Sequence, residues 1–310
     1  MNTQVVQEFV HPALLYRDAG EYLAGTVPFI QDGLAAGEPV AVAVPAPNLA
    51  LLRDALGSDA NRVQLRDMAV AGRNPGRILP MVLLPFANAH AGRRVRIIGE
   101  PIWPGRSLAE YPACAQHEAL INAAFEGRQA TILCPYDITG LDPDWVADAY
   151  RTHPVMLTPT RRWDSPAYTD PVAVAAEFNH PLPEPPAGTA SITIDFFTLR
   201  AARHFVIEQA SWAGLTADRI QELALAVNEL ATNSVRHGGG TGELAVWVQD
   251  GHLICQLSDR GSLNNPLAGR IPAPREAPGG RGLLMVNQLC DLVRIHTTAG
   301  GTTIRIHLSR

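Results

Sequence analysis

The stretch ELALAVNELATNSVRHG, residues 222–238, is the most informative segment of the chain. Its apolar residues recur with helical spacing, and the glycines that begin at Gly238 end the helix. Glu229 and Asn233 are four residues apart, so a carboxylate and an amide share one face of this helix. Because Asn is a poor helix former, we expect that Asn233 serves something other than helix stability.

Surface helices carry such pairs by chance, so the pair gains meaning only from the motifs downstream of it. Asp259-Arg260-Gly261 ends an apolar, strand-like run, and the sequence GGRGL, residues 279–283, opens a further helix. The sequence GGTT, residues 300–303, then leads into a final alternating strand. Together these elements resemble the ATP-binding sandwich of the GHKL superfamily, the Bergerat fold. The segment AVNELATN is most similar to its anti-sigma-factor serine/threonine kinases, and the resemblance covers residues 188–310.

The resemblance assigns a nucleotide site to this region. Asp259 accepts a hydrogen bond from the adenine amino group, and Gly261 lets the backbone come close to the base. Thr302 belongs to the same site in the resemblance. Gly280 and Gly282 precede a helix whose exposed N–H groups suit an anion. Taken alone, an Asp-x-Gly turn and a helix-opening pair of glycines are common features of loops.

The pair on the long helix supplies the chemistry that the resemblance implies. Asn233 holds Mg²⁺ through its side-chain oxygen, because this ion takes few protein ligands. Glu229 is the general base for an attacking hydroxyl, although it could also be an ordinary solvated glutamate. Residues 262–278 are expected to form a mobile lid over ATP. The lid region offers three arginines for the γ-phosphate, between which the sequence does not choose: Arg270, Arg275 and Arg281.

One departure from the family leaves kinase activity a hypothesis that rests on Glu229. Many relatives read Asp-x-Gly-x-Gly, whereas Ser262 and Leu263 follow Gly261 here. The alternatives are a partner-binding module in which ATP is structural or absent, and a plain ATP hydrolase. A histidine kinase is disfavoured, because His117-Glu118 lacks the Arg and Pro that follow the phospho-acceptor His in that class.

Composition excludes several other classes of protein. The chain has 310 residues, which suggests about two domains, and 46% of them are hydrophobic. The net charge of −5 gives no support for nucleic-acid binding. All 25 basic residues are Arg, so a Walker-type P-loop, which requires Lys, is excluded. With no signal segment and no apolar run of membrane length, a cytoplasmic protein is expected.

The four cysteines, Cys114, Cys134, Cys255 and Cys290, are scattered without a C-x-x-C pair. This spacing favours buried structural thiols over a metal site.

Prolines divide the chain into a front domain at 8–157, a linker at 158–187 and a rear domain at 188–310. The front part alternates strand and helix patterns, which predicts a mainly parallel α/β domain. Its expected helices and strands are 21–36, 39–44, 49–56, 63–67, 78–91, 94–99, 113–125, 130–134 and 143–152. In the rear part, consecutive strands predict an antiparallel or mixed sheet with helices on one face, at 190–195, 198–212, 217–237, 243–249, 253–258, 282–290, 292–297 and 302–308.

The front domain resembles the MEDS-type sensory domain. The resemblance rests on segments such as HPALLY at 11–16, GEPIW at 99–103, CPYD at 134–137 and THP at 152–154. It implies a small organic ligand at the carboxyl edge of the sheet. Nine side chains are candidates for that site, with backbone or core roles as the alternative: His11, Tyr16, Glu100, Trp103, His117, Glu118, Tyr136, Asp137 and His153.

The two resemblances together imply a cytoplasmic regulator of transcription under stress. The rear domain would bind Mg·ATP, sequester a sigma factor and phosphorylate Ser or Thr on an anti-anti-sigma protein of the STAS type. The front domain would sense a signal. Relatives of the rear domain pair through their sheets, which predicts a homodimer.

Overall fold

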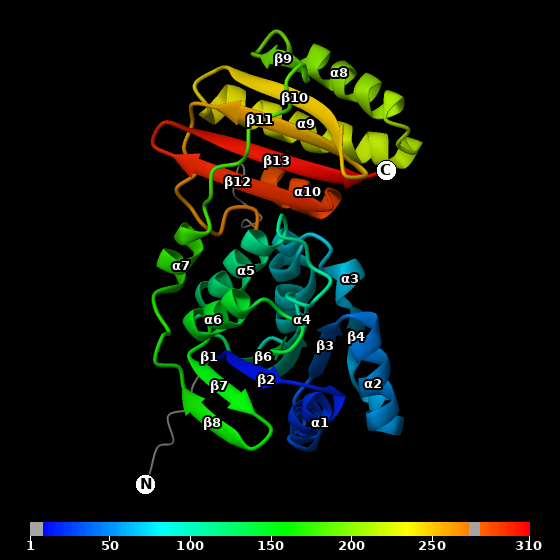
Figure 1. Cartoon of the computed structure of the whole chain (residues 1–310), viewed down its shortest axis with the longest axis vertical. Coiled ribbons are helices and arrows are strands. Elements are labelled where there is room, and N and C mark those ends of the chain that lie inside the picture. The colour runs from blue at the N-terminus through cyan, green and yellow to red at the C-terminus, as the bar shows by residue number, and fades with distance from the viewer. Residues whose placement is uncertain (1–8, 273–279) are drawn as a thin grey trace. The chain divides into compact units, whose positions relative to one another are not determined.

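The computed structural model describes residues 9–272 and 280–310 (Figure 1). The chain divides into two compact units. The first consists of the residues up to Arg73 together with Met81–Phe178, and the second of Asn74–Pro80 together with Asn179–Arg310. Two elements, β8 (Arg161–Asp164) and α7 (Pro171–Glu177), lie within the Pro-rich range 158–187.

The first unit is built on an eight-stranded sheet in the order β4-β3-β5-β6-β2-β7-β8, with β1 also paired to β6. All pairs are parallel except β7 with β8, which confirms the mainly parallel prediction. The strands besides β8 are β1 (Phe9–Val10), β2 (Pro12–Tyr16), β3 (Val40–Val44), β4 (Gln64–Asp67), β5 (Val95–Gly99), β6 (Ala130–Asp137) and β7 (Val155–Thr158).

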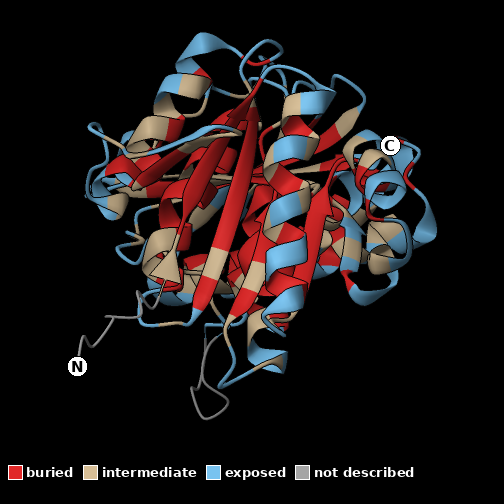
Figure 2. Cartoon of the chain, turned by 90° about the horizontal axis from the view of Figure 1, so that it is seen from below, coloured by how far each residue is buried: buried red, intermediate tan, exposed pale blue. Residues whose placement is uncertain are grey.

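Helices accompany this sheet and leave the central strands buried (Figure 2). Every residue of β3, with the sequence VAVAV, is buried. Such an apolar run, without polar residues facing water, is typical of a parallel strand that is covered on both faces. The helices besides α7 are α1 (Ala19–Ala35), α2 (Ala46–Leu56), α3 (Met68–Ala71), α4 (Leu84–Ala89), α5 (Tyr111–Ala124) and α6 (Pro143–Thr152), and short 3₁₀ turns span Gly57–Arg62 and Pro75–Arg77.

The helix expected over 78–91 is confirmed, since the chain is helical from Ile78 to Ala89. Its first part is not α-helical, because a π-helix occupies Leu79–Leu83 before α4 at Leu84–Ala89. Pro80 and Pro85 account for this irregularity, since proline lacks the N–H that a regular helix requires and crowds the preceding turn.

The second unit contains a five-stranded sheet in the order β12-β13-β11-β10-β9, with every pair antiparallel. This confirms the predicted antiparallel sheet. Its strands are β9 (Ala190–Ile194), β10 (Gly242–Gln249), β11 (His252–Asp259), β12 (Leu292–Thr298) and β13 (Gly301–Ser309), and its helices are α8 (Leu199–Trp212), α9 (Ala217–His237) and α10 (Gly282–Leu289).

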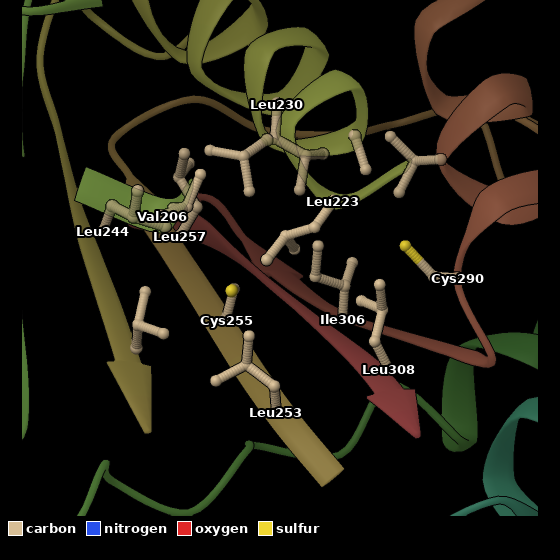
Figure 3. Close-up of a cluster of buried hydrophobic side chains, with 14 of the residues drawn as sticks. Val206, Leu223, Leu230, Leu244, Leu253, Cys255, Leu257, Cys290, Ile306 and Leu308 are labelled. Carbon is tan, nitrogen blue, oxygen red and sulfur yellow. The ribbon is translucent and has the colours of Figure 1, made fainter. Parts of the chain in front are cut away.

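Helix α9 has the bounds that the sequence predicts. Thr216 caps its N-terminus, where the hydroxyl accepts from Arg219 N–H at 3.4 Å, and Gly238 follows its last residue. The buried face of α9 carries Leu223 and Leu230, which pack toward Leu257 and Ile306 of the sheet (Figure 3). Full burial of one such side chain contributes about 1.5–3 kcal/mol. The apolar stripe therefore holds α9 on the sheet and fixes where its polar face points.

The four cysteines are free and buried, as predicted. Across the part of the chain that the structure describes, no helix has both the length and the apolar character needed to cross a membrane.

Candidate active site

The Glu229–Asn233 pair lies on the half-buried face of α9, against the start of α10. A Cβ atom on Gly282 would lie 2.6 Å from Glu229 Oε2 and 3.4 Å from Asn233 Nδ2. The helical spacing therefore brings both side chains to one place, as predicted. The same contact explains the glycine, because any larger residue at 282 would displace the Glu229 carboxylate.

Asp259, the last residue of β11, is held at both carboxylate oxygens. Its Oδ2 accepts a hydrogen bond from the Ser234 hydroxyl, and its Oδ1 accepts from the Gly261 N–H at 2.8 Å. A Cβ atom on Gly238 would lie 2.4 Å from Asp259 Cγ. The end of α9 thus both orients the carboxylate and leaves room for it.

Two threonine hydroxyls fix the loop that follows Asp259. Thr302 donates to the Gly261 carbonyl at 2.8 Å, and the Thr297 and Thr302 hydroxyls are 2.8 Å apart. Thr297 Oγ1 also accepts from the Leu263 N–H at 2.9 Å. A Cβ atom on Gly261 would lie 2.6 Å from the His237 carbonyl oxygen, so this position requires glycine for packing.

Most of the predicted nucleotide-binding residues line one cavity of about 680 Å³. Six of them line it: Asn233, Asp259, Gly261, Gly280, Gly282 and Thr302. Its apolar wall comes from Leu263, Leu267, Ile271, Leu283 and Ile304. Glu229 and Arg281 are not among the lining residues. Cavities of this size with an apolar wall and a few convergent polar groups are typical of small-molecule sites.

The predicted lid, 262–278, is described only as far as residue 272, so Arg275 lies outside the described residues. Gly269 in this segment is fixed to α10, because its carbonyl accepts from Asn287 Nδ2 at 3.0 Å. Of the other two arginines proposed for the γ-phosphate, Arg270 is half-buried and Arg281 is exposed at the N-cap of α10.

Sequence reasoning missed Ser234, Gly238 and Thr297, which all support Asp259 or the loop after it. The one available signal was Ser234, a small polar residue that directly follows Asn233 near the end of the helix. Ser234 and Gly238 precede Asp259 by 25 and 21 residues, and Thr297 follows Leu263 by 34, so a local pattern gives no information about these contacts.

In the first unit, the contacts of the nine candidate sensor residues form two main groups. Tyr16, Glu100 and Asp137 lie at the carboxyl edge of the sheet, as predicted for a ligand. The Tyr16 hydroxyl donates to Glu100 at 3.2 Å, and Asn48 Nδ2 donates to both Glu100 oxygens. Burial raises the pKa of Glu100 to about 8, although these hydrogen bonds oppose the shift.

His11, Glu118 and His153 form the second group, with Tyr136 beside His153. His11 and His153 precede parallel strands β2 and β7, which places them at the amino ends of these strands. Burial, and then the neighbouring His153, lower the pKa of His11 to about 4. Burial would raise the pKa of Glu118, but the two imidazoles hold that pKa below its usual range.

The remaining two candidates are Trp103 and His117. Trp103 stacks on the Arg106 guanidinium, whose carbon lies 3.9 Å from the ring centre. His117 is buried on α5 next to Glu118. The position of Trp103 therefore fits the alternative in which it supports packing.

Two family models match separate parts of the chain. Residues 10–154 match the family model described as "MEDS: MEthanogen/methylotroph, DcmR Sensory domain". Residues 194–308 match the model described as "Histidine kinase-like ATPase domain". The chain carries a MEDS domain and a histidine kinase-like ATPase domain. The second family implies that this domain binds ATP.

Two solved structures are also similar to parts of the chain. One holds the RsbU and RsbW domains of Rv1364c from Mycobacterium tuberculosis, with 25% identity and a TM-score of 0.31. It is matched over 40% of this chain and 33% of its own length. The other is the Acinetobacter baumannii histidine kinase AdeS, with 11% identity and a TM-score of 0.24, over 64% of this chain and 94% of its own. The chain has no significant match among curated proteins.

Proposed function

We propose that the protein is an ATP-dependent anti-sigma factor. Its ATPase domain binds Mg·ATP, sequesters a sigma factor and phosphorylates Ser or Thr on an anti-anti-sigma partner of the STAS type, in the cytoplasm. The observation that carries the proposal is Asp259, whose carboxylate is fixed at both oxygens on the wall of a cavity that Asn233 also lines.

The residues present fit adenine. Each oxygen of Asp259 already accepts one hydrogen bond. A carboxylate has about four acceptor sites, so it can still accept one from the amino group of the base. Leu263, Ile271 and Ile304 supply an apolar wall suited to a flat ring. The cavity volume of about 680 Å³ is within the range of small-ligand sites.

Asn233 and the start of α10 fit the phosphate end. Asn233 lines the cavity and offers one amide oxygen, which suffices because Mg²⁺ takes few protein ligands beside phosphate oxygens and water. The ion supplies neutralisation of phosphate charge when it is bound. The N–H groups at the N-terminus of α10, near Gly280 and Gly282, favour an anion.

Glu229 is the proposed general base. It lies one turn of α9 from Asn233 and touches Gly282 at the start of α10, where the phosphates would lie. A carboxylate in that place can accept the proton of a Ser or Thr hydroxyl, which typically contributes about 10²–10⁴-fold to the rate. The MEDS domain would modulate this activity through a small organic ligand, and a homodimer would form through the sheets of the ATPase domains.

Phosphate transfer to the partner tests the proposal. The full chain is incubated with γ-labelled ATP, Mg²⁺ and the STAS protein that co-purifies with it from its own cell. We expect label on a Ser or Thr of that protein, and no label with Glu229→Gln. ATP binding without label in the wild type would reject kinase activity. It would favour the second candidate function, partner capture with structural ATP. The sequence also favours this alternative, because Ser262 and Leu263 follow Gly261, so that Leu263 stands where the family's Asp-x-Gly-x-Gly pattern has its second glycine. Phosphate release without any acceptor would favour a hydrolase.

A further inference from the structure

Four buried side chains of the MEDS domain meet at one point, on four different segments of the chain. His11 lies between β1 and β2, Glu118 on α5, Cys134 on β6, and His153 between α6 and β7. Each is at most 1% exposed. One nitrogen, oxygen or sulfur atom from each lies within 4.8 Å of the other three. The proposed function of the ATPase domain uses none of them.

Hydrogen bonds around His11 fix which of its nitrogens carries the proton. Asn122 Nδ2 donates to the carbonyls of Thr152 at 2.8 Å and Ala119 at 3.2 Å. The Asn122 amide oxygen therefore faces His11 Nδ1, 3.2 Å away, and must accept from it. With the proton on Nδ1, His11 Nε2 presents a lone pair to the cluster.

His153 is oriented in the same way. Its Nδ1 lies 2.9 Å from the Ala149 carbonyl oxygen, an acceptor that requires the proton on Nδ1. The Thr152 hydroxyl, also 2.9 Å from Nδ1, has the Asp148 carbonyl at 3.0 Å for its own proton. His153 Nε2 is buried without a hydrogen bond and points toward Glu118. A carbonyl that fixes the far nitrogen of a histidine is the usual support of a metal ligand.

Glu118 faces two imidazoles and a thiol. No well-directed hydrogen bond reaches either of its oxygens from the residues in the described ranges, and only a proton on an imidazole Nε2 or on the Cys134 thiol would supply a donor. Within those ranges its ion-pair contacts are His153 Nε2 at 3.0 Å and His11 Nε2 at 3.4 Å, the two atoms that present lone pairs. The thiol of Cys134, 3.3 Å from His11 Nε2, supplies one proton at most. A buried carboxylate that faces acceptors is costly unless a cation joins them.

We propose that this cluster is a structural zinc site with His11, Glu118, Cys134 and His153 as its ligands. Zinc bonds of about 2.0–2.3 Å in a tetrahedron place ligand atoms about 3.3–3.6 Å apart. The observed separations of 3.3 and 3.4 Å fall in that range, and the 3.0 Å between His153 Nε2 and Glu118 Oε2 is slightly shorter. Two imidazoles, a carboxylate and a thiolate form a borderline-soft set that favours zinc over Mg²⁺ or Ca²⁺. Cys134 would release its proton on binding the ion.

The site is of the closed, structural kind. Four protein ligands fill a tetrahedron, and complete burial leaves no position for water or substrate. The ion would tie α5 to the segments that begin β2 and β7 and to the middle of β6. This assignment replaces the expectation that Cys134 is only a packing thiol.

Metal analysis of the full chain tests the site. Purified protein is dialysed against weakly chelating buffer, and zinc is measured by mass spectrometry. We expect about one zinc ion per chain, and a loss of most of it in Cys134→Ser. The matched control is Cys255→Ser, a buried thiol in the ATPase domain, which should retain the ion. Equal zinc in both variants would overturn the site.

Cobalt provides a readout that does not depend on whether a variant folds. The wild-type chain is refolded without metal and titrated with Co²⁺ alone. We expect intense visible bands of tetrahedral cobalt and a thiolate-to-cobalt band in the near ultraviolet, both removed by stoichiometric zinc. A chain that folds fully without metal and binds neither ion would overturn the proposal and show that a proton occupies the cluster. Nucleotide binding is not part of this readout, so the zinc site and the proposed kinase can fail separately.

Discussion

Glu118 and Glu229 occupy the same local pattern in two different domains. Each is a helical glutamate in an apolar run, followed four residues later by an asparagine, Asn122 or Asn233. Both pairs share one helix face because of that spacing. Yet Glu118 is completely buried among imidazoles, whereas Glu229 is half-buried beside the start of α10.

The surroundings of the asparagine explain the difference. The Asn122 amide is committed to two backbone carbonyls and to His11, so that it supports a closed cluster. Asn233 instead lines an open cavity. An identical spacing thus belongs to a buried polar cluster in one domain and to the edge of an open cavity in the other. Changes at the two glutamates should therefore affect different properties of the protein.

Glu229→Gln should produce the largest effect, and on activity alone. The amide keeps the size of the side chain but cannot accept the hydroxyl proton. We expect phosphate transfer to fall about 10²–10⁴-fold, with ATP affinity and thermal unfolding close to those of the wild type. Glu208→Gln, an exposed change on α8, is the control and should leave transfer unchanged. Phosphate transfer by Glu229→Gln at the wild-type rate would show that Glu229 is not the general base, and the proposed contrast with Glu118 would then fail.

Glu118→Gln should show the opposite pattern. The amide has no negative charge to balance a cation held by the two imidazoles. The MEDS domain should therefore lose about 3–5 kcal/mol of its free energy of unfolding. Thermal unfolding followed by circular dichroism measures the loss, and calorimetry should find ATP binding unchanged. The exposed Glu126→Gln, just after α5, is the control. Stability equal to the wild type would show that the buried cluster has no cation-dependent role.

Glu100 should make the MEDS domain sensitive to pH. Burial raises its pKa from 4.5 to about 8, so the folded state holds a proton that the unfolded chain releases. The stability from this group is fully present below pH 4.5 and is lost as the pH rises through about 8. The slope is at most about 1.4 kcal/mol per pH unit. Urea unfolding over this range should show the fall in the wild type and a weaker fall in Glu100→Gln; parallel curves would contradict the assignment.

Gly238→Ala should have a smaller effect, confined to the nucleotide site. Its methyl group would meet Asp259 Cγ at 2.4 Å and must displace that carboxylate. Overpacking of this kind costs about 1–3 kcal/mol, and we expect ATP to bind about tenfold more weakly. Gly300→Ala is the control, because a methyl group there meets nothing closer than 3.6 Å. Unchanged affinity in both variants would show that Asp259 does not need its observed position.

The sequence predicted most of the ATPase domain because its signals are local. An apolar stripe and a terminal glycine mark α9, and apolar strand-like runs mark the strands of the sheet. The MEDS domain was harder. The short strand β2 is buried on both faces and shows no alternation, and periodicity does not reveal that the helix containing Pro80 and Pro85 is a π-helix over Leu79–Leu83.

The candidate site of the ATPase domain was also easier to predict from the sequence than the buried cluster of the MEDS domain. Asp259, Asn233 and Gly282 follow recognisable turns and helix starts, and the structure brings them to one cavity. The partners that hold Asp259, such as Ser234, depend on hydrogen bonds between distant segments. The cluster of His11, Glu118 and His153 could not be separated from the carboxyl-edge residues by sequence, because only the register of β2 with β7 shows that both histidines precede their strands.

The most direct test of the central claim is a calorimetric titration of the full chain with ATP in the presence of Mg²⁺, comparing wild type with Asp259→Asn. Asp250→Asn, in the turn at the other end of β11, is the matched control. We predict saturable binding in the wild type and in the control, and an affinity about 10–100-fold lower in Asp259→Asn, since a hydrogen bond to a charged group contributes about 1.5–3 kcal/mol. No binding by the wild type, or equal affinity in all three proteins, would contradict the claim.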